Sequence, residues 1–254
     1  MSPRPYALSL AGFDPSAGAG LLADCKTMEA LGVYGLGACT ALTVQNDVQF
    51  SQVSWVPLAQ VQAQSQLLFE RFRVAWAKLG LVENLAQVPA LLGWLRAQNP
   101  RLGVVWDPVL KASAGYEFHA TTPPGLVEQV CRQLALLTPN QPEMLRLWPA
   151  ASAEAAAVAV SAWCPVLLKG GHAAGPEATD VLFVQGREVA RYSLPRLPHG
   201  AKHGSGCVLS AAITAELAKG QPLPEACRRG KAYTARVLAS NDTLLGYHSF
   251  TQSD

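Results

Sequence analysis

The chain lacks a strong excess of charge of either sign. Its 254 residues carry a formal net charge of +2, and no long run of one sign occurs among them. A nucleic-acid-binding surface normally shows a basic patch, and an electrostatic membrane site shows clustered lysines and arginines. We therefore expect a small-molecule substrate, with neither nucleic acid nor membrane as a partner.

Cysteine motifs are also missing. The six cysteines are scattered, none of them forms CxxC, and no group of Cys and His has the spacing of a zinc site. This pattern favours a reducing, cytoplasmic protein over a secreted protein built on disulfides.

No apolar run is long and unbroken enough to predict a membrane span. The Ala-rich stretch from Ala150 to Leu168 comes nearest, but Glu154 and Pro165 interrupt it. The N-terminal "YALSLAGF" is short for a signal peptide and is closed by Asp14. We interpret the first stretch as a helix followed by a strand, and the second as an opening β-strand.

What the sequence does contain is a regular alternation of strand and helix patterns. Half of the residues are hydrophobic, which is ample material for a core. Strand-like runs occur over residues 6–12, 35–45, 74–82, 102–108, 134–140 and 165–171, with a hairpin over 179–194. Helical patterns occur over residues 20–32, 58–72, 84–98, 123–134, 205–219 and 223–239. The alternation predicts a doubly wound α/β fold with a mostly parallel sheet and helices on both faces. No linker or repeat divides the chain, so we expect one domain over residues 1–254.

Polar residues follow the predicted strands where each one ends. Because ligands of such sheets bind at the carboxyl ends of the strands, we expect these side chains to share one site. They are Asp14, Gln45, Lys78, Asp107, Asn140, Glu143, Lys169 and the loop at Gly204.

The stretch "HGSGCVLS" predicts an anion cradle at the start of a helix. The backbone N–H groups of Gly204, Ser205, Gly206 and Cys207 are free to bind a phosphoryl group, and the glycines allow close approach. The same position is expected to lower the pKa of the Cys207 thiol, which could then act as a base. A small buried core cysteine is the alternative. The other Gly-rich loop, "GFDPSAGAG", matches neither GxGxxG nor a Walker motif, so it is either a phosphate loop or a flexible connection.

Two carboxylates and an amide suggest a magnesium site. Asp107 ends the strand "VVWDP", and Asn140 and Glu143 lie in "TPNQPEM". Mg²⁺ needs only one or two carboxylates and keeps several waters. Helix capping is the alternative for Asn140 and Glu143, and a turn is the alternative for Asp107. Lys169 in "LLKGGH" is either a phosphate contact or a solvated loop lysine.

Taken together, these motifs resemble one family. "AGFDPSAGAGLLADCKTMEALGVYG", "TALTVQND", "WDPVL", "TPNQPE", "LLKGGH", "HGSGCVLSAAITAELAKG" and "GKAY" occur in the order and near the spacing of hydroxymethylpyrimidine/phosphomethylpyrimidine kinases of thiamin synthesis. The resemblance covers roughly Tyr6 to Ala239. It implies a ribokinase-like fold and a kinase that uses ATP and Mg²⁺.

The resemblance also implies roles for single residues. Gly204, Ser205 and Gly206 match the anion hole, and Cys207 matches the catalytic cysteine. The matches to substrate-binding positions are Gln45, Gly12 and Asp24. The matches to phosphate-binding positions are Lys169, Asn140 and Lys231, and those to metal-binding positions are Asp107 and Glu143. A homodimer is a further expectation from such kinases.

The chain departs from the family pattern near the substrate. Phe13 replaces a small residue, Ala17 a glycine, and Lys202 a threonine, while residues 110–115 and the chain end also differ. A ring of Phe13 that points into the pocket would crowd the larger, phosphorylated substrate. A pyridoxal kinase of the same superfamily and a non-catalytic pyrimidine-binding protein therefore remain as alternatives.

Overall fold

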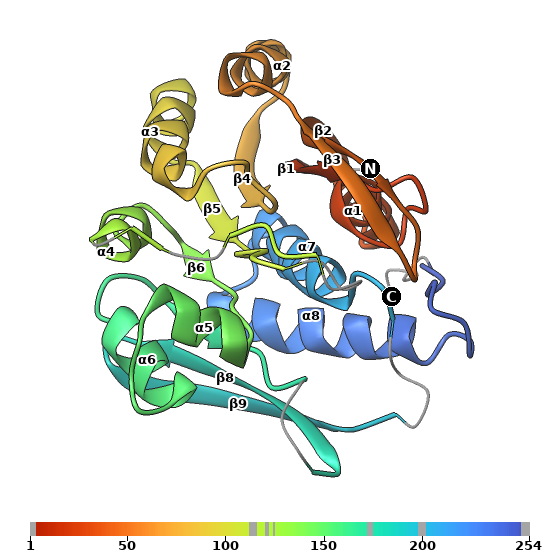
Figure 1. Cartoon of the computed structure of the whole chain (residues 1–254), viewed down its shortest axis with the longest axis vertical. Coiled ribbons are helices and arrows are strands. Elements are labelled where there is room, and N and C mark those ends of the chain that lie inside the picture. Colours follow the sequence, from red (N-terminus) through yellow and green to blue (C-terminus); the bar gives the residue numbers. More distant parts are fainter. Residues whose placement is uncertain are drawn as a thin grey trace.

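The β/α alternation forms one sheet whose middle strands are parallel (Figure 1). The computed structural model describes residues 4–111, 116–119, 122–123, 125–171, 175–197 and 202–249. Within these residues the strand order is β3-β2-β1-β4-β5-β6-β7-β8-β9. The strands are β1 (Tyr6–Phe13), β2 (Tyr34–Gln45), β3 (Phe50–Trp55), β4 (Val74–Leu79), β5 (Gly103–Trp106), β6 (Leu136–Leu137), β7 (Val166–Leu168), β8 (Glu177–Val184) and β9 (Arg187–Pro195).

The sheet is parallel in its centre and antiparallel at both edges. Strands β2, β1, β4, β5, β6 and β7 pair in parallel, whereas β3 pairs antiparallel with β2, and β8 pairs antiparallel with β7 and β9. The predicted hairpin is confirmed, with Gly186 at φ +76 in its turn. Strand β3 was not predicted, because "FSQVSW" mixes exposed and half-buried residues and contains no continuous apolar run.

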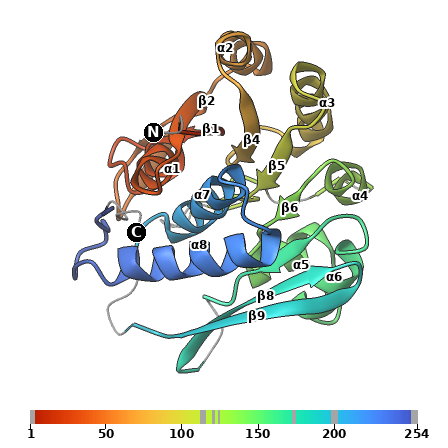
Figure 2. The ribbon, with the colours of Figure 1, turned by 180° about the vertical axis from the view of Figure 1, so that it is seen from behind.

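Helices cover both faces of the sheet (Figures 1 and 2), as the alternation predicts. One face packs against a core that includes residues of α2, α3, α4, α5 and α6, and the other face packs against α1, α7 and α8. The helices are α1 (Gly20–Ala30), α2 (Leu58–Arg71), α3 (Val88–Gln98), α4 (Leu126–Cys131), α5 (Gln141–Leu147), α6 (Ala153–Val160), α7 (Ser205–Ala218) and α8 (Leu223–Leu238), with a short 3₁₀ helix, η1 (Leu85–Gln87), before α3.

Strand alternation decides which side chains reach which layer. In β1, Leu8 and Leu10 enter the core below α2 and α3, while Ala7 enters the core below α1 and α7. Ser9 shares the face of Ala7, and the register places it opposite Lys78 of β4. Two polar residues of the central strands therefore point toward α1 and α7.

Local signals set several helix ends. The Asn84 side chain caps η1, and the α-helix begins only at Val88, with Pro89 in its first turn. The helix therefore starts later than the pattern over residues 84–98 predicts, since proline fits the first turn of a helix but not its interior. The Ala-rich stretch forms the short helix α6 and then β7, as expected.

Among the described residues, none of the helices combines the length and apolar character that a bilayer crossing needs. Of the segments that depart from the family pattern, residues 112–115 and 250–254 lie outside the described residues.

Gly20, at the start of α1, is one of the glycines near the site where the fold leaves no room for a side chain. Its φ is +58, and a Cβ would lie 2.2 Å from the carbonyl oxygen of Gly12. We expect Gly20→Ala to lower the free energy of unfolding by about 2 kcal/mol or more, from left-handed strain and the clash together. Gly93→Ala is the control, because that exposed helical glycine has nothing within 4 Å of its Cβ position. Urea unfolding of both variants measures this, and equal stability of the two would contradict it.

Candidate active site

The predicted strand ends converge on one large cavity. It has a volume of about 1120 Å³ and lies at the carboxyl ends of the parallel strands, against the start of α7. Of the site residues predicted from the sequence, Asp14 and Asp24 do not line it, and all the others do. Those that line it are Gly12, Gln45, Lys78, Asp107, Asn140, Glu143, Lys169, Gly204, Ser205, Gly206, Cys207 and Lys231.

The predicted anion cradle is the first turn of α7. Gly204 is the N-cap at φ +75, and a Cβ there would lie 2.1 Å from the Gly18 carbonyl oxygen. A Cβ at Gly206 would lie 3.3 Å from Nζ of Lys169 and 3.7 Å from a carboxylate oxygen of Asp107. The glycines therefore let the loop before α1 and the charged side chains approach the helix terminus closely.

A buried pair joins the first loop to this cradle. His203 Nε2 lies 2.8 Å from Oδ2 of Asp14, and both side chains are almost fully buried. The Asp14 carboxylate also accepts hydrogen bonds from the backbone N–H groups of Ser16 and Ala19. Burial raises the Asp14 pKa, but the hydrogen bonds from His203, Ser16 and Ala19 outweigh it and lower the pKa overall. His203 directly precedes the glycines, but no motif in the sequence indicated a partner for it.

Asp107, Lys169 and Glu143 form a second charged group, next to Gly206. Lys169 Nζ lies 2.7 Å from Oδ1 of Asp107 and 3.7 Å from Oε2 of Glu143. Burial would raise the pKa of Asp107, but Lys169 and Lys78 hold it below its usual range. Burial raises the pKa of Glu143, and Lys169 offsets this only in part. Burial lowers the Lys169 pKa, but the two carboxylates outweigh it and keep the ammonium charged.

The capping alternative for Asn140 and Glu143 is confirmed. The Asn140 side chain accepts a hydrogen bond from the Glu143 N–H at 2.8 Å, and the Glu143 carboxylate accepts one from the Asn140 N–H at 2.8 Å. This reciprocal pair is a capping box at the start of α5. Both residues nevertheless line the cavity, so capping fixes their position rather than removing them from the site.

The donor set fits a magnesium ion that is shared with a nucleotide. Asp107 and Glu143 present two carboxylates at one side of the cavity. Within the described part of the chain, no group of three or more His, Cys, Asp or Glu side chains could hold a metal alone. Mg²⁺ usually takes one or two carboxylates plus substrate phosphates and waters, so two are enough.

Lys231 reaches the cavity from α8. Its Nζ lies 2.9 Å from Oδ2 of Asp180 in β8, while Oδ1 of Asp180 accepts a hydrogen bond from the Gly170 N–H. This contact links Lys231 to the loop that follows Lys169. No sequence pattern indicated Asp180, because its position depends on how the β8–β9 hairpin pairs with β7.

The Cys207 thiol lines the cavity, but the expected lowering of its pKa is wrong. Burial raises the pKa to about 11, and the nearby carboxylates of Asp24 and Asp107 act in the same direction. The Lys78 ammonium and a hydrogen bond from the Gly20 N–H lower the pKa, but by less than burial and the carboxylates raise it. The helix start was visible in the sequence, whereas the depth of burial was not.

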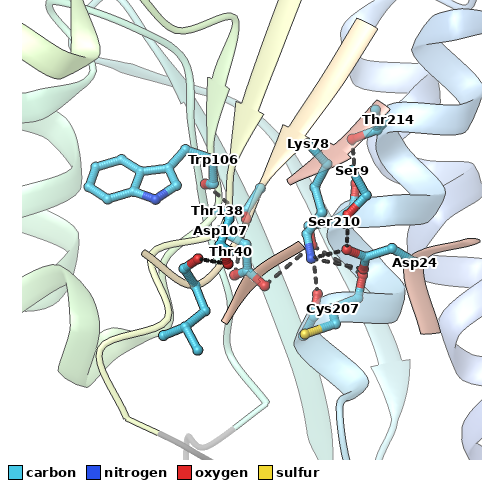
Figure 3. A network of polar contacts seen from close by, with 12 residues as sticks. Ser9, Asp24, Thr40, Lys78, Trp106, Asp107, Thr138, Cys207, Ser210 and Thr214 are labelled. Carbon is cyan, nitrogen blue, oxygen red and sulfur yellow. Dashed lines mark hydrogen bonds and ion pairs between the residues drawn. The ribbon is translucent and has the colours of Figure 1, made fainter. Parts of the chain in front are cut away.

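Asp24 does not line the cavity, which corrects the expectation that it contacts the substrate directly. It lies in α1 behind Cys207, and its carboxylate oxygens lie 2.7 and 2.8 Å from Nζ of Lys78 (Figure 3). Ser9 donates a further hydrogen bond to it at 2.6 Å. The side chains of Asp24 and Lys78 are both fully buried. The pattern "ADCK" at a helix start gave no sign of this partner in β4.

The end of the cavity near β2 is bounded by Gln45, Gly12, Phe50 and Phe118. The two rings contact each other edge to face, with centroids 5.3 Å apart. Phe13 is not among the residues that line the cavity, so the proposed crowding by its ring finds no support. Phe50 and Phe118 were not predicted as site residues, since neither belongs to a motif.

The fold and site together define a kinase with a ribokinase-like α/β fold. Residues 14–251 match the model of the family described as phosphomethylpyrimidine kinase. The chain therefore belongs to the phosphomethylpyrimidine kinase family.

Similar proteins agree with this assignment. The hydroxymethylpyrimidine/phosphomethylpyrimidine kinase of Rhizobium meliloti is 38% identical over 94% of this chain and 92% of its own. Pyridoxal kinase from Staphylococcus aureus, solved with ADP, has a TM-score of 0.82 at 25% identity over 98% of this chain and 95% of its own. Phosphomethylpyrimidine kinase from Clostridium difficile has a TM-score of 0.75 at 28% identity, over 91% and 98%.

The Asp14–His203 contact predicts a specific loss of stability in acid. Because the pKa of Asp14 is lowered by folding, its contribution is complete above the unfolded value of about 3.9 and disappears as the pH falls through the folded value. Asp14→Asn should cost about 1–3 kcal/mol at pH 7 and flatten the loss of stability below about pH 4. Urea unfolding from pH 2 to pH 7 measures both. Asp242→Asn, at an exposed residue, is the control, and an unchanged acid profile in Asp14→Asn would contradict the assignment.

Proposed function

We propose that this kinase transfers the γ-phosphoryl group of ATP to the hydroxymethyl group of 4-amino-5-hydroxymethyl-2-methylpyrimidine, and then to its monophosphate, in thiamin biosynthesis. One observation carries the proposal: the Gly204–Cys207 turn, Lys169 and Asp107 meet on the cavity that also contains Gln45. Family membership agrees with this substrate class.

The described residues support an in-line transfer. The N–H groups at the start of α7 stabilise the moving phosphoryl group, and Lys169 and Lys231 add positive charge. The substrate oxygen bonds to the γ-phosphorus as the bond to the ADP oxygen breaks, and the hydroxyl proton passes to Cys207 Sγ. A Mg²⁺ ion held by Asp107 and Glu143 would neutralise phosphate charge in this site.

Gln45 supports the choice of a pyrimidine. Its amide donates and accepts hydrogen bonds at once, which suits the amino donor and ring-nitrogen acceptor of an aminopyrimidine edge, whereas pyridoxal presents a phenolic hydroxyl and an aldehyde in place of that edge. Gln45 is half-buried, and if a bound ring covers its amide and leaves one bond unmade, the cost is about 1–3 kcal/mol, which corresponds to about tenfold or more in selectivity. Pyridoxal phosphorylation is the second candidate, because pyridoxal kinase from Staphylococcus aureus shares the fold.

A coupled assay of ADP release tests the proposed substrate. We expect release with the hydroxymethylpyrimidine and with its monophosphate, and release slower by about tenfold or more with pyridoxal. A preference for pyridoxal would overturn the pyrimidine assignment in favour of the second candidate.

Three further properties of the chain are proposed together with the substrate. We propose that the chain acts as one kinase domain over residues 1–254, in the cytoplasm and as a homodimer. The six free cysteines support a reducing compartment, and the homodimer rests on the resemblance to such kinases. Light scattering after size-exclusion chromatography tests the homodimer.

Cys207→Ala tests the proposed base. Turnover should fall by about a hundredfold or more, while ATP binding and the melting temperature stay close to those of the native chain. Because a base must be deprotonated and the Cys207 pKa is about 11, the native rate should rise with pH between 7 and 9. That rise should be absent from the variant. Near-normal turnover in Cys207→Ala would return this residue to a structural role.

Asp107→Asn tests the proposed metal contact. The substitution removes a charge beside Lys169 and should raise the Mg²⁺ concentration needed for half-maximal rate by about tenfold, which corresponds to the loss of about 1.4 kcal/mol of binding. A chelator should abolish activity and added Mg²⁺ should restore it. An unchanged Mg²⁺ requirement together with a lower melting temperature would show that Asp107 serves stability alone.

A further inference from the structure

A fully buried ion pair lies directly behind the proposed base. Lys78 in β4 and Asp24 in α1 are in contact through both carboxylate oxygens, at 2.7 and 2.8 Å, and neither side chain is exposed to solvent. The register of β1 and β4 brings Ser9 beside Lys78, and the Ser9 hydroxyl donates to Asp24. The position of both charges is therefore fixed by the central strands.

Stability alone does not explain this pair. Removing two charges from water is expensive, and well-packed apolar residues of similar size are often as stable as a buried ion pair, or more so. Lys78 nevertheless lies in a central strand among apolar neighbours, at the wall of the cavity. We therefore interpret the buried charge of Lys78 as serving the cavity that it lines rather than the stability of the core.

Cys207 is the neighbouring residue whose thiolate the positive charge of Lys78 would stabilise. Figure 3 shows Cys207 beside the Lys78–Asp24 pair, at the start of α7. Other charged groups around the thiol are Asp24 from α1, Asp107 after β5 and Lys169 after β7. Among these charges, Lys78 changes the pKa of the Cys207 thiol most, and it lowers this pKa by more than Asp24 raises it.

We propose that Lys78 is a positioning residue for phosphoryl transfer, which Asp24 holds in place and which stabilises the negative charge on Cys207 Sγ before Sγ takes the substrate proton. This inference rests on the proposed role of Cys207 as the base. It assigns Asp24 to the support of Lys78 instead of to the substrate. The two residues thus form a second layer behind the thiol that touches the substrate.

The test removes both charges together, so that no unpaired charge remains in the core. The variant is Lys78→Met with Asp24→Asn, and the readout is the pH dependence of Cys207 alkylation by iodoacetamide, followed by mass spectrometry of its peptide. The midpoint should rise by about one pH unit, the equivalent of a tenfold smaller thiolate fraction. Turnover at pH 8 should fall about tenfold, with little change in the KM for ATP. If this variant does not fold, Lys78→Leu with Asp24→Ala replaces it.

Ser9→Ala is the matched control. It removes a hydrogen bond to Asp24 in the same buried network but leaves both charges, so it should not move the alkylation midpoint. An unchanged midpoint in the double variant, with a lower melting temperature, would overturn the proposal and make Lys78 a structural residue. Because alkylation is measured without turnover, this result is separate from the test of Cys207 itself. A shifted midpoint with normal turnover in Cys207→Ala would leave the electrostatic effect intact and refute only the catalytic role.

Discussion

The site depends on the close contact between the start of α7 and the loop before α1. Gly204 can make this contact only without a side chain, since a Cβ would meet the Gly18 carbonyl oxygen at 2.1 Å. The buried Asp14–His203 pair holds the same two segments together, through the residue just before Gly204 and a residue of the loop before Gly18. Because this contact sets where the free N–H groups of α7 point, the cradle is determined by backbone packing and not by a flexible side chain.

Buried charge is arranged around this contact in compensating pairs. Lys78 faces Asp24 behind Cys207, and Lys169 faces Asp107 and Glu143 near Gly206. Each lysine stays charged despite burial because a carboxylate is within contact distance. A bound nucleoside triphosphate would add negative charge, which the lysines that line the cavity can offset. Because the charged side chains are already paired in the fold, the proposed phosphoryl transfer needs no large rearrangement of them.

Periodicity and strand ends predicted most of this architecture, because both are local properties of the sequence. The parallel centre of the sheet, the hairpin at Gly186 and the convergence of Gln45, Asp107 and Lys169 all follow from them. Contacts between distant segments were not readable in the same way. The partner of Asp24 lies 54 residues away in the sequence, and the burial of Cys207 reverses the effect of its helix terminus. Strand β3 was not predicted because it contains no continuous apolar run.

Substrate choice in this fold rests on few side chains. The overall fold is shared with a pyridoxal kinase at a TM-score of 0.82, so the fold alone cannot distinguish the two heterocycles. We propose that the ring binds at the end of the cavity bounded by Gln45 from β2 and Phe50 from β3, so the residues that distinguish the two rings would lie there. These strands form an antiparallel edge pair outside the parallel centre. If the ring binds there, phosphoryl transfer and ring recognition use separate parts of the sheet, so substitutions near Gln45 could change the substrate while the start of α7 is kept.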